Sequence, residues 1–338
     1  MNLRFKLAAI LAGSLSISAN AVSGEELSVA TFVPPSHETI TGALAWFENE
    51  LTSRSNGELT LKVYAAGQLG AGPPQQYKRA VEGVADITFG IAASTPTLFP
   101  KTMLAILPGK ALGGPDSTRR MWTVFDKYVA DEWSDVKVLA VGNPAGGMII
   151  ATKDVSTIEG LRGAKIVPWA AITTPVLQGM GAVPVQLDPT EHYTALSTGT
   201  IDAAISSINN IMPPWNLDEV ANYAVVNTPA TFNPVFYVMN KERYESLSAK
   251  HQKIIDEISG MPFSMQLVQA FHDADEVALK WKDEKIAAGE LNVEWIVTSD
   301  RERAKMEAAA AAGMEAIYSD YADRGIQNAQ KIYEALNK

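Results

Sequence analysis

The chain has 338 residues, of which 47% are hydrophobic and 20% are charged. These proportions exclude a disordered or collagen-like chain, and the length is enough for two domains with sizeable cores. Lys and Arg number 28 against 38 Asp and Glu, and this acidic balance argues against nucleic acid as a partner. With 0 cysteines the chain has no disulfide, no Cys-based zinc site and no thiol nucleophile.

The first residues predict export. Arg4 and Lys6 precede an apolar stretch, Leu7 to Ala19, that is too short to span a bilayer. Ala19-Asn20-Ala21 fits the small-residue cleavage pattern, so residues 1–21 are predicted to be a signal peptide cut after Ala21. No later apolar run is long enough for a membrane helix, so we expect an exported protein without membrane insertion of its own.

Strand-like and helix-like segments alternate twice along the chain. The first unit is predicted as strand, helix, strand, helix and strand over 28–32, 36–51, 59–64, 73–82 and 85–89, with Ser36 as the first helix cap. The second unit repeats this order over 164–168, 173–180, 183–187, 189–198 and 202–205. This order is typical of open, mostly parallel sheets, so the predicted fold class is α/β with two lobes.

The two units also share a spacing. In each, a Tyr is followed six residues later by a Gly and three residues after that by an Asp. The two triplets are Tyr77, Gly83 and Asp86, and Tyr193, Gly199 and Asp202. We interpret each as a helix, its glycine cap and an Asp that enters a strand and accepts N–H groups there. Coincidence between common helix–turn–strand solutions is the alternative.

The C-terminal third is predicted to be helical. Helical periodicity covers 250–258 and a long amphipathic stretch over 262–288. Two further helices rich in Ala, Glu and Lys are expected over 301–312 and 314–335. We interpret these helices as a brace across both lobes, and an oligomerisation helix is the alternative.

Ligands of open parallel sheets bind beyond the carboxyl ends of the strands. Here that rule selects the turns 34–38, 90–95, 169–173 and 206–210. No Lys or Arg occurs from 166 to 240 or from 80 to 100, so these turns hold no fixed cation for a carboxylate. The candidate ligand-binding residues are His37, Glu38, Ala92, Ser94, Trp169, Ser206, Asn209, Trp215, Phe232 and Asn233.

Aromatic rings with one carboxylate suit a small ammonium ligand, so we expect a small amine or amino alcohol. The rings of Trp169, Trp215 and Phe232 would pack against its carbons, and Glu38 would be its counter-charge. Ser94, Ser206 and Asn209 would bond a hydroxyl group. Ordinary packing of each Trp, a helix-dipole role for Glu38 and local capping by His37 are the alternatives.

Three blocks of sequence resemble the TRAP-transporter solute-binding proteins, in the order that is usual for that family. The first is AAGQLGAGPPQQYKRAVEGVADITFG, the central one runs through LRGAKIVPW, GMGAVPVQL and YTALSTGTIDAA, and the last is NPVFYVMNKERYESLSAKHQKIIDEIS. Together they cover most of residues 25–260. The resemblance implies a two-lobe periplasmic binding protein (type II-like), with a long hinge-spanning helix, a helical C-terminus, a periplasmic location and delivery of a small solute to a membrane permease.

The chain departs from the family pattern where a carboxylate is usually clamped. The family's second-lobe strand reads K-I-R, and here Val167 stands in place of the Arg. A second family Arg has no counterpart in Gly146 to Ile149, and the family's D-G-x-E-N strand end reads Asp202 to Ser206. These departures favour the amine over a carboxylate or polyol, which stay as alternatives.

The expected organisation has four parts. Residues 1–21 are the signal peptide, 22–145 with about 231–260 the first lobe, 146–230 the second lobe, and 261–338 the connecting helix and C-terminal helices. We expect a monomer that uses no metal and no cofactor and is not an enzyme. A secreted hydrolase is the remaining alternative, although neither an HExxH nor a Gly-x-Ser-x-Gly motif is present.

Overall fold

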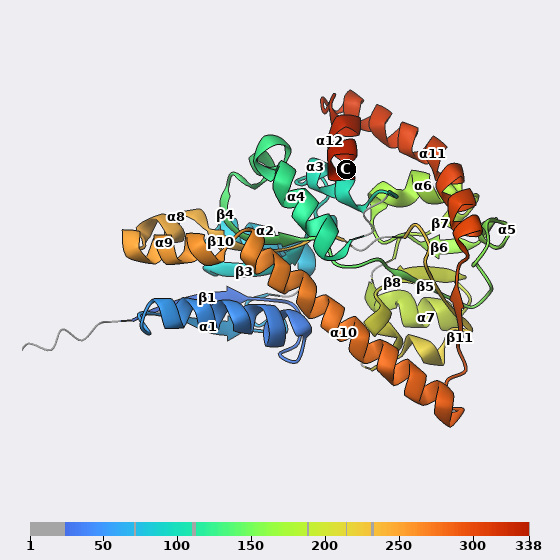
Figure 1. Cartoon of the computed structure of the whole chain (residues 1–338), viewed down its shortest axis with the longest axis horizontal. Helices are drawn as coiled ribbons and strands as arrows, with labels where there is room; N and C mark the ends of the chain where they lie inside the picture. Colours follow the sequence, from blue (N-terminus) through green and yellow to red (C-terminus); the bar gives the residue numbers. More distant parts are fainter. Residues whose placement is uncertain are drawn as a thin grey trace, which may run out of the picture.

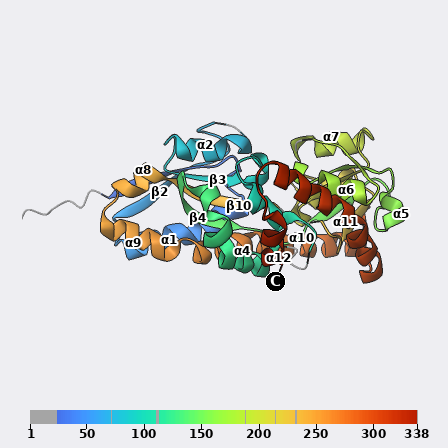
Figure 2. The same cartoon turned by 90° about the horizontal axis from the view of Figure 1, so that it is seen from above.

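The computed structural model describes residues 24–70, 72–109, 113–187, 189–213, 215–230 and 233–337. Its strands form two sheets, each at the centre of one lobe, and the lobes lie side by side along the long axis (Figures 1 and 2). The order in the first sheet is β2-β1-β3-β10-β4, and in the second it is β11-β9-β5-β8-β6-β7. The predicted two-lobe α/β fold is confirmed.

The strand bounds place each sheet in the chain. The first sheet contains β1 (Glu25–Ala30), β2 (Leu59–Tyr64), β3 (Ile87–Ile91), β4 (Val136–Gly142) and β10 (Val235–Asn240). The second contains β5 (Met148–Ala151), β6 (Lys165–Val167), β7 (Val183–Pro184), β8 (Ala203–Ser206), β9 (Tyr223–Val226) and β11 (Glu294–Val297). The chain therefore passes from the first lobe to the second between β4 and β5, and returns between β9 and β10.

Helices cover both sheets. Those between the strands are α1 (Ala45–Arg54), α2 (Gln76–Val81), α3 (Pro100–Met103), α4 (Gly114–Tyr128), α5 (Ile158–Leu161), α6 (Thr174–Gly179) and α7 (His192–Ser197). The later ones are α8 (Lys241–Ser246), α9 (Ala249–Ile258), α10 (Met261–Ala288), α11 (Asp300–Asp323) and α12 (Ala329–Leu336). Short turns of helix also follow several strands, among them η1 (Thr39–Leu44), η3 (Ala92–Ser94) and η8 (Ile208–Ile211).

Each sheet is less parallel than the sequence predicts. In the first sheet β10 runs antiparallel to both β3 and β4, and in the second β5 runs antiparallel to both β8 and β9. Both exceptions are the first strand after the chain changes lobe. Such a strand enters without the crossover helix that parallel neighbours need, so it is free to run the other way.

The repeated Tyr–Gly–Asp spacing has the predicted structural role. Gly83 and Gly199 adopt φ values of 68° and 69°, the left-handed conformation that ends a helix. Asp86 accepts the backbone N–H of Ser28 on the neighbouring strand at 2.7 Å, and Asp202 accepts that of Lys165 at the same distance, 2.7 Å. Both carboxylates therefore fasten one strand to the next, in equivalent places of the two lobes.

The C-terminal segment contacts both lobes, but it is not wholly helical. Helix α10 packs against α4, β4 and η1 in the first lobe and against η8 in the second (Figure 1). After it, β11 adds an edge strand to the second sheet beside β9, which the helical expectation missed. The expected break at Gly313 is also wrong, because α11 runs unbroken from Asp300 to Asp323 and packs on α6.

Candidate functional site

Three of the four turns selected by the strand rule take part in two groups of contacts, and the turn 90–95 belongs to neither. The first group lies where the loop before η1 meets η8, which follows β8 of the second lobe. The second lies where β6 ends, close to the segment that leads into β10. The groups differ in chemistry, because the first is polar and acidic and the second is mostly apolar.

In the first group, Glu38 and Asn209 join the two lobes. The Asn209 Nδ2 donates to Glu38 Oε1 at 3.2 Å. The His37 Nδ1 lies 3.4 Å from the other Glu38 oxygen. Among the candidates on this side, Ser206 is buried and its Oγ accepts from Asn210 Nδ2 at 2.9 Å. These contacts place Glu38 where the two lobes meet, beside the amide of Asn209 and the imidazole of His37. We call this contact region the interlobe seam.

His37 caps the chain locally, as one of the sequence alternatives proposes. Its Nδ1 accepts the backbone N–H of Thr39 at 3.3 Å, at the start of η1. The predicted cap at Ser36 is wrong, because the helix begins only at Thr39. Burial lowers the pKa of His37 below its usual 6.5, and the charge of Glu38 opposes this effect. The neutral ring is the form that accepts the Thr39 N–H through Nδ1.

Asp275 on α10 belongs to the same seam and was missed by the sequence reasoning. It is 8% exposed, and the backbone N–H of Asn209 and the Ser207 side chain face it as donors. Burial, together with the nearby charge of Glu38, raises the pKa of Asp275 to about 7, while these two donors oppose the rise. One sequence signal could have found it. The buried positions of α10 include Leu267, Phe271, Asp275 and Ala278, so a carboxylate stands within an apolar helical stripe.

In the second group, Trp169 and Asn233 lie together. The Asn233 Nδ2 donates to the Trp169 carbonyl oxygen at 3.0 Å, and Asn233 is buried. Trp169 is half-buried and packs against hydrophobic cores of both lobes. The ring is therefore placed at the interlobe junction, where the sequence puts it.

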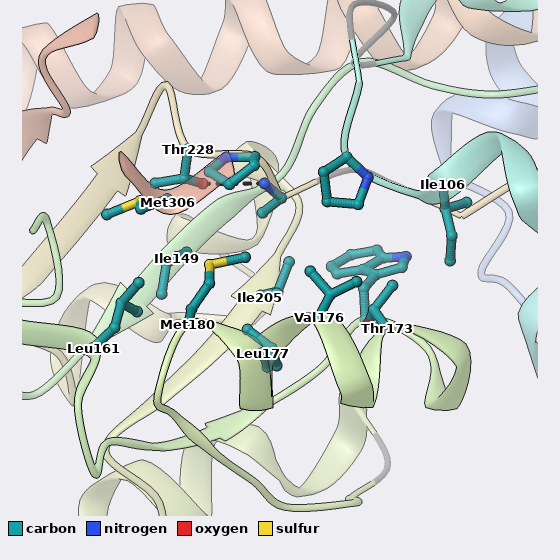
Figure 3. Close-up of a pocket in the computed structure, with 14 residues that line it drawn as sticks. Ile106, Ile149, Leu161, Thr173, Val176, Leu177, Met180, Ile205, Thr228 and Met306 are labelled. Atoms are coloured by element: carbon teal, nitrogen blue, oxygen red, sulfur yellow. Dashed lines mark hydrogen bonds between the residues drawn. The ribbon is translucent and has the colours of Figure 1, made fainter. Parts of the chain in front are cut away.

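A small cavity lies beside Trp169, and the room in it that a water-sized sphere can occupy is about 30 Å³. Its lining side chains converge from α6, α11, the second sheet and the loops near the interlobe segments (Figure 3). None of its described lining residues is charged. They are Ile106, Pro108, Ile149, Leu161, Trp169, Thr173, Val176, Leu177, Met180, Ile205, Thr228, Pro229, Ala230 and Met306.

The other candidates are placed apart from these groups or outside the description. Ala92 is fully buried, and its backbone N–H donates to the Pro234 carbonyl at 2.9 Å. Trp215 is 39% exposed on the surface of the second lobe, which fits poorly with a ring enclosed around a ligand. Ser94 is half-buried in η3. Phe232 lies outside the described residues.

Charged groups that could fix a ligand are few here. Val167, in the place of the family's Arg, is 2% exposed and packs in the second-lobe core with Met148 and Leu196. Within the described ranges, no group of three or more His, Asp and Glu side chains is arranged to hold a metal ion. No described helix is both long and apolar enough to cross a membrane.

Comparisons with known proteins agree with this architecture. Residues 29–320 match the model of the family described as bacterial extracellular solute-binding protein, family 7 (DctP). A curated relative, the outer membrane transporter protein TsaT of Comamonas testosteroni, is 25% identical over 347 residues, covering 99% of this chain and 98% of that protein.

Solved structures are similar over nearly the whole chain. A marine metagenome TRAP solute-binding protein specific for aromatic acids, from an unidentified microbe, was solved with metahydroxyphenylacetate. It is 27% identical with a TM-score of 0.82, over 92% of this chain and 97% of that one. A TRAP solute-binding protein of Rhodoferax ferrireducens, solved with copurified benzoate, is 25% identical with a TM-score of 0.81. The match covers 93% of this chain and 96% of that protein. This chain therefore belongs to the DctP family of TRAP solute-binding proteins, which are non-enzymatic components of periplasmic solute transport.

Proposed function

We propose that this protein is the receptor that captures a small solute bearing an uncharged ring and delivers it to its own TRAP permease. The observation that carries the proposal is the pocket beside Trp169, whose described walls are apolar apart from two threonines. The chain would be exported by the signal peptide 1–21 and would act as a monomer. The lobes would be 22–145 with about 231–260, and 146–230, and residues 261–338 would brace them.

The ring follows from the free energy of burial. An aromatic ring buries roughly 150–250 Å². At about 25 cal/mol per Å², that area supplies about 4–6 kcal/mol. A polyol would instead lose its hydrogen bonds to water against these walls. The relatives from the marine metagenome and from Rhodoferax ferrireducens, both solved with ring-bearing acids, support the same class.

A more specific part of the proposal concerns the charge on the polar group of the ligand. We propose an aromatic monocarboxylate, held by hydroxyl and amide donors and not by an arginine clamp. The second candidate is an amine, which the sequence favours and to which Glu38 at the interlobe seam gives specific support. An unpaired buried charge costs several kcal/mol, so the site will discriminate strongly between the two.

The test uses three ligands with the same ring and different charge: benzoate, benzylamine and benzyl alcohol. Thermal denaturation and calorimetry with the mature chain should show binding of benzoate and no binding of benzylamine, because a bound ligand stabilises only the folded state. The opposite order would establish the amine, and binding of a polyol but none of the three would refute the ring. Recovery of unchanged ligand separates capture from hydrolysis.

Replacing Trp169 by Ala should weaken binding of whichever ring ligand is found. A central aromatic contact contributes roughly 2 kcal/mol or more, which is about 30-fold in Kd. Calorimetry gives the value directly. Trp215→Ala is the matched control, because its ring is 39% exposed and its loss should leave Kd unchanged. An equal loss of affinity in both variants would instead show that Trp215 also contacts the ligand.

A further inference from the structure

The interlobe seam contains two carboxylates that one asparagine contacts from both sides. The side chain of Asn209 donates to Glu38 at 3.2 Å. The backbone N–H of the same residue and the Ser207 side chain face Asp275, and both lower its pKa. Glu38 comes from the loop before η1 in the first lobe, Asn209 from η8 in the second, and Asp275 from α10, which packs on both. The cluster therefore joins three segments that lie far apart in the sequence.

Asp275 is buried, and its surroundings do not supply enough hydrogen bonds to stabilise a negative charge on its carboxyl group. It is 8% exposed, and its Oδ1 has no hydrogen-bond partner among the residues that the structure describes. A buried carboxylate with one unsatisfied oxygen is unfavourable, whereas the protonated acid is tolerated. Burial and the charge of Glu38 both act in this direction and raise the pKa of Asp275 to about 7.

The charged groups around Asp275 do not supply a cation in the described structure. From the loop before η1 come Glu38 and His37, and burial lowers the pKa of His37 while the charge of Glu38 opposes this. The η8 segment, Ile-Asn-Asn-Ile, carries no titratable group. On α10 itself, His272 and Glu276 pair with each other at the exposed surface, and Asp273 accepts from Gln269. Glu38 is thus the charge that bears on Asp275.

We propose that Asp275 is a proton-dependent latch for lobe closure, because its carboxyl group must be neutral for Glu38 to rest against Asn209 in the closed seam. Separation of the lobes would take Glu38 away and admit water, and both changes stabilise the ionised form. The closed state therefore binds one more proton than the open state. Closure should be favoured at low pH and lost as the pH rises through about 7.

This latch rests on the capture between lobes proposed above, but its test needs no solute. The chain has 0 cysteines, so Lys78→Cys and Thr194→Cys place one spin label on α2 and one on α7, on opposite lobes (Figure 2). Pulsed electron paramagnetic resonance then measures the interlobe distance between about pH 6 and about pH 8.5, a range that brackets the pKa of about 7 for Asp275.

In the labelled parent, we expect the distance distribution to shift to longer values with a midpoint near pH 7. Asp275→Asn, which keeps the shape but cannot ionise, should stay at the short distance throughout. Glu38→Gln removes the like charge and should move the midpoint to lower pH. Asp273→Asn, on the same helix but exposed, is the matched control and should behave as the parent.

Two results would overturn the latch: a parent distance that does not change with pH, or an Asp275→Asn variant with the parental pH dependence. His37→Gln should retain the transition, and its loss there would assign the switch to His37 instead. Circular dichroism of each variant checks folding, and Glu38→Gln keeps the test decisive if Asp275→Asn folds poorly. None of these results depends on which solute binds, so the ligand proposal stands or falls separately.

Discussion

Gly313→Val should lower the free energy of unfolding by about 3 kcal/mol, because two helix backbones touch at this glycine. A Cβ atom at Gly313 would lie 2.2 Å from the Pro175 carbonyl oxygen, and one at Gly179 would lie 2.7 Å from that of Ala309. Helices α6 and α11 can therefore approach this closely only with glycine at both positions. Urea unfolding followed by circular dichroism measures the loss.

The same substitution should also weaken ligand binding. Thr173, Val176, Leu177 and Met180, on and beside α6, line the Trp169 pocket, and so does Met306 of α11. Forcing the two helices apart moves these walls. Ala312→Val is the matched control, because residue 312 is exposed on the same helix and the change costs less than about 1 kcal/mol in helix propensity. Equal destabilisation by both variants would contradict the backbone-contact argument.

Glu132→Ala should be at least as damaging, with an expected loss of about 3–5 kcal/mol. The carboxyl group of Glu132 accepts the backbone N–H groups of Lys101 and Thr102 and the Thr102 hydroxyl, and so caps α3 from a distant part of the chain. Thr102 is 1% exposed, so water cannot replace the lost acceptor. Each buried donor left unsatisfied costs about 1–3 kcal/mol.

Asp131→Ala provides the comparison for Glu132. Its carboxylate pairs with the Lys101 ammonium at 2.5 Å, but the Asp131 side chain is 69% exposed. Exposed ion pairs contribute about 0–1 kcal/mol, so this variant should unfold nearly as the parent does. Thermal or urea unfolding of the two variants side by side decides the point. A small loss for Glu132→Ala would mean that α3 finds another cap.

What the sequence predicts correctly is mainly local. Gly83 and Gly199 end helices because few other residues adopt their φ values, and Asp86 and Asp202 follow them at a fixed distance along the chain. The order of strands and helices follows from the same short-range patterns. These features depend on neighbours within a few residues, which the sequence displays directly.

What the sequence does not predict depends on contacts between distant segments. The pairing of β11 with β9 places Glu294 opposite Tyr223, and neither segment contains a local pattern that predicts this pairing. Gly313 reads as a helix break, but the contact with Pro175 makes glycine necessary inside the helix. Trp215 and Trp169 are equally plausible as ligand rings until their exposure is known. A single aromatic residue in a loop follows no periodic pattern that would tell whether its ring faces the cleft or the solvent.

The site was only partly predictable for the same reason. The strand-end rule correctly brings Glu38 near Asn209, and it selects Trp169, but its partner Asn233 lies before a strand and not in a turn that the rule selects. It overlooks Asp275, because that residue lies in a helix and not in a turn after a strand. It also says nothing of the walls that α6 and α11 give to the pocket.

The late position of β11 has a consequence for the order in which the protein can be assembled. A chain that emerges N-terminus first has every strand of the first sheet once Asn240 is out, but the second sheet lacks its edge strand until Val297 follows. During that interval the outer edge of β9 presents unpaired N–H and C=O groups. Chains interrupted between these two points would therefore carry a complete first sheet beside an open-edged second one, and self-association through β9 would be their characteristic defect.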